Sequence, residues 1–165
     1  SYASSTTGVC TVDAGTGAIT TIAVGTCTLT ATRAADANYL VSASSAPQAF
    51  TVTQGTQTIT FAQPTSPATF GTTFLVAPTA SSGLVVTVAA TGGCTIASGT
   101  VTMTSGTVAC VLTASQAGDA NYAAAADVVR TVAASQAAQA TVTLTVPASG
   151  TVGQAGLTAS AKAVS

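Results

Sequence analysis

The chain has 165 residues, of which 4% are charged, and its formal net charge is −1, whereas about 25% of residues are charged in an average globular protein. Three basic residues give no electrostatic footprint for nucleic acid, the absence of histidine removes the commonest general base, and no apolar run is long enough to span a bilayer. We therefore expect no nucleic-acid binding, no membrane insertion, no enzymatic activity, no small-molecule substrate, and no metal or cofactor.

Alternation of threonine with apolar residues predicts short β-strands along the chain. The pattern covers 26–32, 58–61 and 141–146, where Cys, Leu, Val or Ala share one face and β-branched Thr the other. Gly and Ser clusters interrupt such runs at intervals of about ten residues, which is typical of a sandwich of short strands. These clusters lie at 14–17, 71, 81–83, 92–93, 98–99 and 105–106. The run Ala123–Ala126 is helical in composition but its counterpart Leu40–Ala43 is not, so we expect both to be extended or loop segments.

Four cysteines form two pairs, Cys10 with Cys27 and Cys94 with Cys110. An even number at a repeated spacing in a Thr- and Ser-rich chain predicts disulfides formed in an oxidising compartment. Each disulfide closes a loop of about 16 residues, which contributes about 3 kcal/mol in the chain-entropy model. The alternative, a four-cysteine metal site, needs C-x-x-C pairs or histidine partners at short spacing, and the sequence has neither.

The chain repeats itself with a period of about 83 residues. The matches are Cys10 with Cys94, Cys27 with Cys110, Asp36–Tyr39 with Asp119–Tyr122, and Pro64 with Pro147, at offsets of 84, 83, 83 and 83. Self-similarity at a fixed period indicates tandem structural units. The chain is therefore expected to hold almost two copies of one unit.

Each half resembles the bacterial immunoglobulin-like repeats of long surface adhesins and secreted multi-repeat or filament proteins. The resemblance rests on Gly25–Ala31 with Ala35–Tyr39, on Ala109–Ala114 with Gly118–Tyr122, and on the opening strand Gln57–Phe61 followed by Pro64. It implies an all-β fold of tandem immunoglobulin-like β-sandwiches, about 83 residues per repeat with one disulfide each. It also implies a location outside the cell or on a bacterial cell surface.

The resemblance predicts the domain boundaries as well. Residues 54–135 would form one intact domain, 1–53 the C-terminal two thirds of a split domain, and 136–165 the N-terminal third of the next domain or of the same one, permuted. Two arrangements follow: a window on a long tandem array, or a discrete subunit whose missing strands come from its neighbour. Both predict an open head-to-tail assembly of the protein with itself.

The motif Asp-Ala-Asn-Tyr occurs once in each copy and predicts a structural turn. Its candidate residues are Asp36, Asn38, Tyr39, Asp119, Asn121 and Tyr122. Asp and Asn side chains hydrogen-bond nearby backbone, and we expect the tyrosine to bury its ring and anchor its hydroxyl on the loop. The alternative is a Ca²⁺ or sugar site, since Asp and Asn supply hard oxygen ligands, although one carboxylate per copy is few for Ca²⁺.

The remaining charged residues do not form a catalytic set. Asp13 and Asp127 have no copies at matching positions, so the four aspartates do not predict the converging acid pair of a glycosidase. Arg33 and Arg130 are expected to be loop or rim charges, and Lys162 without any glutamate does not predict an isopeptide crosslink.

The larger apolar residues are the candidates for the core. They are Phe50, Phe61, Phe70, Phe74, Leu29, Leu75, Leu84, Leu112 and Leu144. The Thr rows on the opposite faces favour solvated strands over an ice-binding surface, because sandwich sheets twist and an ice-binding face is flat.

We therefore expect a structural building block of a bacterial extracellular filament or surface stalk, assembled head to tail from copies of itself. One alternative is an adhesin module that binds a host or environmental ligand; the 4% aromatic content argues against it, because binding hot spots favour Trp and Tyr. The other alternative is a spacer attached to an extracellular enzyme.

Overall fold

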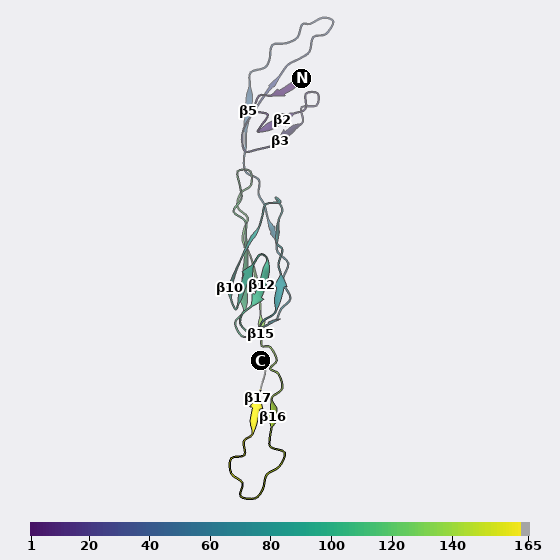
Figure 1. The fold of residues 1–165 in the computed structure, drawn as a ribbon. Helices are drawn as coiled ribbons and strands as arrows, with labels where there is room; N and C mark the ends of the chain where they lie inside the picture. Colours follow the sequence, from purple (N-terminus) through teal and green to yellow (C-terminus); the bar gives the residue numbers. More distant parts are fainter. Residues whose placement is uncertain (163–165) are drawn as a thin grey trace. The chain divides into compact units, whose positions relative to one another are not determined.

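The computed structural model describes residues 1–162 and is all-β, which confirms the fold class at this level (Figure 1). Residues 163–165, which end the predicted segment 136–165, lie outside the described residues. The strands are β1 Tyr2–Ser4, β2 Cys10–Val12, β3 Ile19–Thr21, β4 Gly25–Ala31, β5 Gln48–Val52, β6 Ile59–Thr60, β7 Ala68–Thr69, β8 Thr73–Leu75, β9 Thr79–Ala80, β10 Thr87–Gly92, β11 Cys94–Ala97, β12 Thr100–Met103, β13 Cys110–Ser115, β14 Val128–Val132, β15 Ala134–Ser135, β16 Thr143–Thr145 and β17 Ser160–Lys162.

The chain divides into two compact units. Unit 1 contains Ser1–Gln63, Ala77–Ala89 and Leu112–Arg130; unit 2 contains Pro64–Val76, Ala90–Val111 and Thr131–Ser165. The units alternate along the sequence, so the boundaries 1–53, 54–135 and 136–165 stay predictions. No described residue lies in a helix that could cross a membrane.

The N-terminal sheet of unit 1 has the order β1-β4-β5, with β4 at its centre. Both neighbours are antiparallel to β4: Tyr2 lies opposite Ala31, and Phe50 lies opposite Cys27. The same unit contains the hairpin β2-β3 and the antiparallel pair β6-β9. Residues directly opposite each other share a face of the sheet, so Phe50 lies on the same face as the disulfide cysteine.

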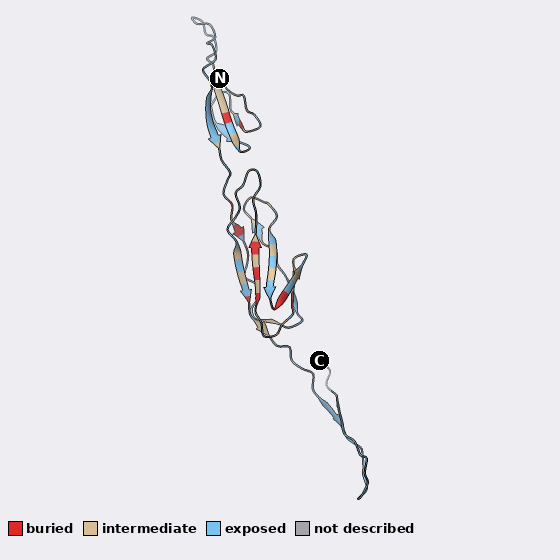
Figure 2. Cartoon of the chain, turned by 90° about the vertical axis from the view of Figure 1, so that its left-hand side faces the viewer, coloured by how far each residue is buried: buried red, intermediate tan, exposed pale blue. Residues whose placement is uncertain are grey.

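A second three-stranded sheet has the order β10-β13-β14, again with a cysteine-bearing strand at its centre. Along β13, Cys110, Leu112 and Ala114 are buried, and the residues between them are half-buried. Period-two burial places these three side chains on one face, which is the core face. Figure 2 shows this strand banded in red and tan.

Unit 2 contains the sheet β11-β12-β8, the parallel pair β7-β15 and the antiparallel pair β16-β17. On β12, Val101 and Met103 are buried while the threonines between them are half-buried. Val132 at the end of β14 is buried as well. The residues of β16 and β17 are all exposed.

The core candidates are only partly confirmed. Phe61 and Leu112 are buried, and Leu29, Phe74 and Leu84 are half-buried. The prediction is wrong for the exposed residues Phe50, Phe70, Leu75 and Leu144. Leu75 follows the inward-facing Phe74 on the same strand, so period two turns it to solvent. The loops after the two Asp-Ala-Asn-Tyr motifs contain no helix, as expected for 40–43 and 123–126.

Candidate functional site

Both copies of the Asp-Ala-Asn-Tyr motif form the same tight turn. In the first, Asp36 Oδ1 accepts hydrogen bonds from the backbone N–H groups of Asn38 and Tyr39, both at 2.9 Å. In the second, Asp119 Oδ1 accepts from Asn121 and Tyr122 N–H, both at 2.8 Å. In each turn the aspartate N–H donates to the tyrosine carbonyl at 2.9 Å. The aspartate side chain therefore stabilises the turn through local backbone bonds, as the motif predicts.

The tyrosine prediction is wrong for both turns. The exposed fraction of Tyr39 is 69% and that of Tyr122 is 36%, so neither ring is buried. A ring is buried only where another element covers it, and the motif alone does not specify such an element.

No metal cluster forms around these turns among residues 1–162, where no three His, Cys, Asp or Glu side chains come together. One carboxylate oxygen in each turn already accepts two N–H groups. The four aspartates lie in three loops, with Asp119 and Asp127 in the connection between β13 and β14, and no carboxylate pair forms among the described residues.

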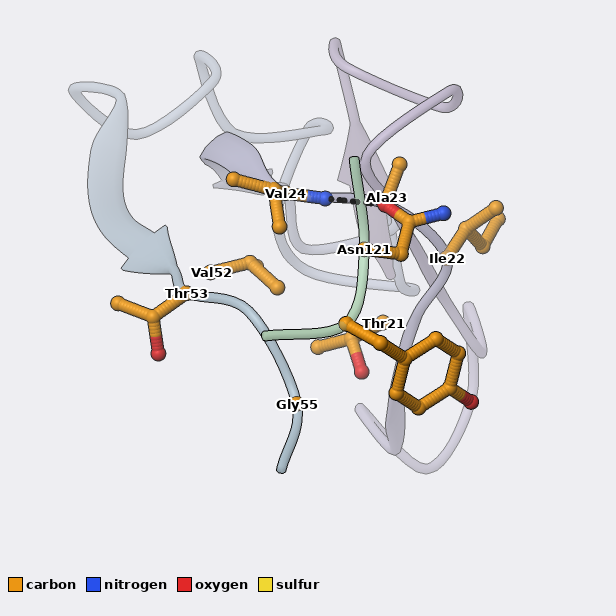
Figure 3. A pocket seen from close by; sticks show the side chains of 9 residues that line it. Thr21, Ile22, Ala23, Val24, Val52, Thr53, Gly55 and Asn121 are labelled. Atoms are coloured by element: carbon orange, nitrogen blue, oxygen red, sulfur yellow. Dashed lines mark hydrogen bonds between the residues drawn. The ribbon is translucent and has the colours of Figure 1, made fainter. Parts of the chain in front are cut away.

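The second turn forms hydrogen bonds with residues that are distant in sequence but lie in the same unit. Asn121 Oδ1 accepts a hydrogen bond from Val24 N at 3.1 Å, which Figure 3 shows as a dashed line. The backbone of Gly55 donates to Asn121 O at 2.8 Å and accepts from Ala123 N at 2.9 Å. Gln54 Nε2 donates to Asp119 O at 2.8 Å. Four hydrogen bonds thus fix the turn against residues 24, 54 and 55.

A pocket of about 280 Å³ lies beside this contact. Its lining residues are Thr21, Ile22, Ala23, Val24, Val52, Thr53, Gly55, Asn121 and Tyr122 (Figure 3). A Cβ on Gly55 would lie 3.3 Å from the ring atoms Cδ1 and Cε1 of Tyr122, which is tighter than ordinary van der Waals contact. The glycine therefore allows the tyrosine ring to approach the backbone closely.

The first turn has a different environment. Arg33 forms an ion pair with Asp36 at 3.2 Å, and both side chains are exposed, so the pair contributes little to stability. The side-chain amide of Asn38 makes no hydrogen bond within the described residues and is exposed, whereas that of Asn121 accepts a hydrogen bond from Val24 N–H and is half-buried. Leu40 and Val41, which follow the turn, are 91% and 63% exposed. The same motif is therefore docked in one copy and undocked in the other.

Sequence reasoning missed a buried polar cluster centred on Gln57, which is 7% exposed. Its Nε2 donates to Gln116 Oε1 and to Ala123 O, both at 2.8 Å, and its Oε1 accepts from Ser82 Oγ at 2.5 Å. The signal was present, because Gln57 has the same period-two phase as the apolar residues of the opening strand.

Two other charged residues, Arg130 and Asp13, form hydrogen bonds within the fold. Arg130 lies on β14 rather than in a loop, and its Nε and Nη2 donate to Phe61 O at 2.8 and 2.7 Å. Asp13 accepts from the N–H and hydroxyl of Thr16 and from Gly15 N–H. These bonds, first the Thr16 N–H, then its hydroxyl and then the Gly15 N–H, lower the pKa of Asp13 below its usual value.

The cysteines form two intrachain disulfides in the pairs that the sequence predicts. Cys10–Cys27 joins β2 to β4 and Cys94–Cys110 joins β11 to β13, with Cα–Cα distances of 5.6 and 5.2 Å. All four residues are buried. Two buried disulfides are consistent with a secreted or extracellular protein.

No protein-family model matches the chain, and no curated protein matches it.

Proposed function

We propose that this chain is a non-catalytic structural building block of a bacterial extracellular filament or surface stalk. Its unit is an immunoglobulin-like β-sandwich repeat of about 83 residues, and copies join head to tail. A strand segment supplied by residues 140–162 completes the open sheet of residues 1–53 in the following copy. The copies belong either to one continuous polypeptide or to separate subunits that exchange strands.

The observation that carries the proposal is the different burial of one sequence pattern in its two copies. The pattern Cys-x-Leu-x-Ala occupies the central strand each time, with Cys27, Leu29 and Ala31 in β4 and Cys110, Leu112 and Ala114 in β13. Leu112 and Ala114 are fully buried, whereas Leu29 and Ala31 are only half-buried. The first copy therefore carries a core face that nothing in the described chain covers completely.

Two further residues lie on this partly uncovered face. Phe50 is opposite Cys27 and is 40% exposed; Tyr2 is opposite Ala31 and is 45% exposed. Because opposite residues share a face, these rings extend the face formed by Leu29 and Ala31. In a β-sandwich the inner faces of two sheets cover each other, so a core face with exposed aromatic rings and half-buried aliphatic side chains supports an incomplete sandwich.

The strand that would cover it lies in the C-terminal segment. In the second copy the opening strand is buried, with Ile59 9% and Phe61 4% exposed. At an offset of 83 these positions become Val142 and Leu144, which are 58% and 64% exposed. Figure 2 shows the C-terminal strands in pale blue. Residues 140–146 thus keep the alternation of a core strand without any core to cover.

The energetic gain on completion follows from these exposed fractions. Full burial of a Val or Leu side chain contributes about 1.5–3 kcal/mol, so burying the exposed parts of three such residues contributes about 3–5 kcal/mol. The three are Val142, Leu144 and Val146, of which the last is 59% exposed. Backbone hydrogen bonds along the added strand add to this gain.

The test uses the full oxidised chain in analytical ultracentrifugation over a range of concentrations. We expect linear oligomers for the wild type, monomers for V142D/L144D, and wild-type behaviour for the matched control V152D, since Val152 is fully exposed in the loop between β16 and β17. A wild-type chain that stays monomeric at high concentration would contradict the proposal. So would a double variant that assembles as well as the wild type.

The denaturing mass of native material, with and without reductant, separates the two forms of the assembly. A mass of 15.7 kDa indicates discrete subunits that exchange strands. A mass of many multiples that reductant leaves unchanged indicates a continuous tandem polypeptide. A large mass that collapses on reduction would indicate interchain disulfides and would contradict the intrachain pairs.

A further inference from the structure

The contact at the second turn links residues 1–53, the first copy of the proposed repeat, to residues 54–135, the second copy. The turn Asp119–Tyr122 of the second copy is bound by the loop 21–24 of the first copy and by the segment 52–55, which spans the boundary between the two copies. Its tyrosine is about half as exposed as Tyr39 in the undocked turn. The contact has two parts: the loop 21–24 with the segment 52–55, which we call the socket, and the turn Asp119–Tyr122.

An open socket lies at the equivalent position, between the second copy and the segment that follows it. At an offset of 83, the loop 21–24 becomes 104–107 and the segment 52–55 becomes 135–138. A pocket of about 330 Å³ lies there, lined by Phe70, Gly106, Thr107 and the segment 136–139. A Cβ on Gly106 would lie 3.1 Å from Gln136 Cα, so the loop and the segment are already packed closely.

The first copy carries a turn without a socket. Its internal hydrogen bonds match those of the docked turn, so its shape is already set. Tyr39, Leu40 and Val41 are 69%, 91% and 63% exposed and form a continuous apolar stretch. The docked copy has alanines at the two positions after its tyrosine.

We infer that the pocket at Phe70, Gly106, Thr107 and 136–139 is the docking site for the Asp36–Val41 segment of the following copy of this chain. The inference rests on the proposed head-to-tail function and names the second contact of each junction. Thr107 N–H, now bonded to Ser105 Oγ at 3.2 Å, is the equivalent of the Val24 N–H that Asn121 binds, and it is the donor for Asn38 Oδ1. Leu40 and Val41 cover the ring of Phe70, which is 51% exposed.

Two substitutions distinguish the open socket from the occupied one. Ala138 stands where Gly55 packs against Tyr122, and its methyl group makes the contact with Tyr39 tighter by a few tenths of an ångström. The exposed Tyr39 ring can shift by that amount. Ala137 stands at the position equivalent to Gln54, so the open socket has no counterpart of the hydrogen bond from Gln54 to the Asp119 carbonyl. Gln136 and Gln139 lie beside this position.

The test compares two signals in the same assembled sample. Hydrogen exchange at residues 141–146 reports addition of the strand, and chemical iodination of Tyr39, quantified by mass spectrometry, reports docking of the turn. On assembly of the full chain we expect the strand to be protected and the reactivity of Tyr39 to be roughly halved, as its exposed fraction moves from 69% toward the 36% of Tyr122. In A138D the socket gains a charge at an exposed position without any change to the core, and we expect the strand protection to remain while Tyr39 protection is lost. A155D, at an exposed alanine in the loop before β17, is the matched control and is expected to behave as the wild type.

Each outcome is decisive. A protected strand with a fully reactive Tyr39 refutes the docking site and leaves the proposed function intact. Tyr39 protection that survives A138D also refutes it, because the tyrosine is then covered by something other than this socket. A strand that stays unprotected in a monomeric chain refutes the proposed function, and the docking site with it.

Discussion

Replacing Gln57 by leucine tests whether the buried amide cluster stabilises unit 1. The side chain is 7% exposed and makes three hydrogen bonds, two through Nε2 at 2.8 Å and one through Oε1 at 2.5 Å. Each such bond contributes about 1 kcal/mol net, and the carbonyl of Ala123 loses a partner, so Q57L is expected to lower the free energy of unfolding by about 3 kcal/mol. For a chain of this length that loss corresponds to roughly 6–12 °C in Tm.

The assay is urea unfolding followed by circular dichroism, with the m-value as the check that the transition itself is unchanged. Q48L is the control, because Gln48 is exposed on β5 and bonds only to the carbonyl of Pro47; it is expected to change stability by less than about 0.5 kcal/mol. Since Gln57 and Gln116 share one bond, the double variant Q57L/Q116L should lose about 1 kcal/mol less than the sum of the single variants. A loss below about 1 kcal/mol in Q57L, or one equal to that of Q48L, would refute the reasoning.

Three more predictions follow from the turns and disulfides. Replacing both cysteines of the second disulfide by alanine should lower stability by about 3 kcal/mol in urea unfolding, and reductant should then have no further effect on that unit. G92A should destabilise far more than G71A in thermal unfolding, since both glycines have φ of +80° but only at Gly92 does a Cβ clash with a backbone carbonyl. For Asp13 the folded pKa is lowered, so its contribution is present above the unfolded pKa of 3.8 and is lost as the pH falls through the folded value. The stability difference between wild type and D13N should therefore shrink below about pH 4, and a difference that grows on acidification would contradict the assigned hydrogen bonds.

The parts of the fold that could be predicted are those fixed by local chemistry. The alternation at 26–32 becomes β4 over Gly25–Ala31, and the aspartate turns form as their side chains dictate. The alternation at 58–61 and 141–146 yields only Ile59–Thr60 and Thr143–Thr145, because a strand extends only as far as a neighbour supplies hydrogen bonds.

What could not be predicted depends on partners distant in sequence. The partner of Gln57 lies 59 residues away, and Arg130 reaches a carbonyl 69 residues away. Burial of the two motif tyrosines differs because only one turn meets a docking segment, although the motif residues are identical. The burial of Val101 and Met103 could have been predicted, since Thr100–Met103 alternates threonine with apolar residues as clearly as 26–32 does.

In the proposed assembly, the strand and the turn would contribute different properties to the junction between two copies. A strand added at the edge of a sheet fixes the register between two copies, but the linker of a few residues beside it leaves backbone torsions free to rotate. The four hydrogen bonds from the turn act on residue 24 and on residues 54 and 55 of the connection between β5 and β6, so they restrict this freedom. A chain with 4% aromatic residues has few large side chains with which to brace a joint, and backbone bonds to a preformed turn need none. Substitution of Asn38 or Tyr39 by alanine would therefore make such a filament more flexible without shortening it. Loss of the strand at 140–146 would instead separate the copies.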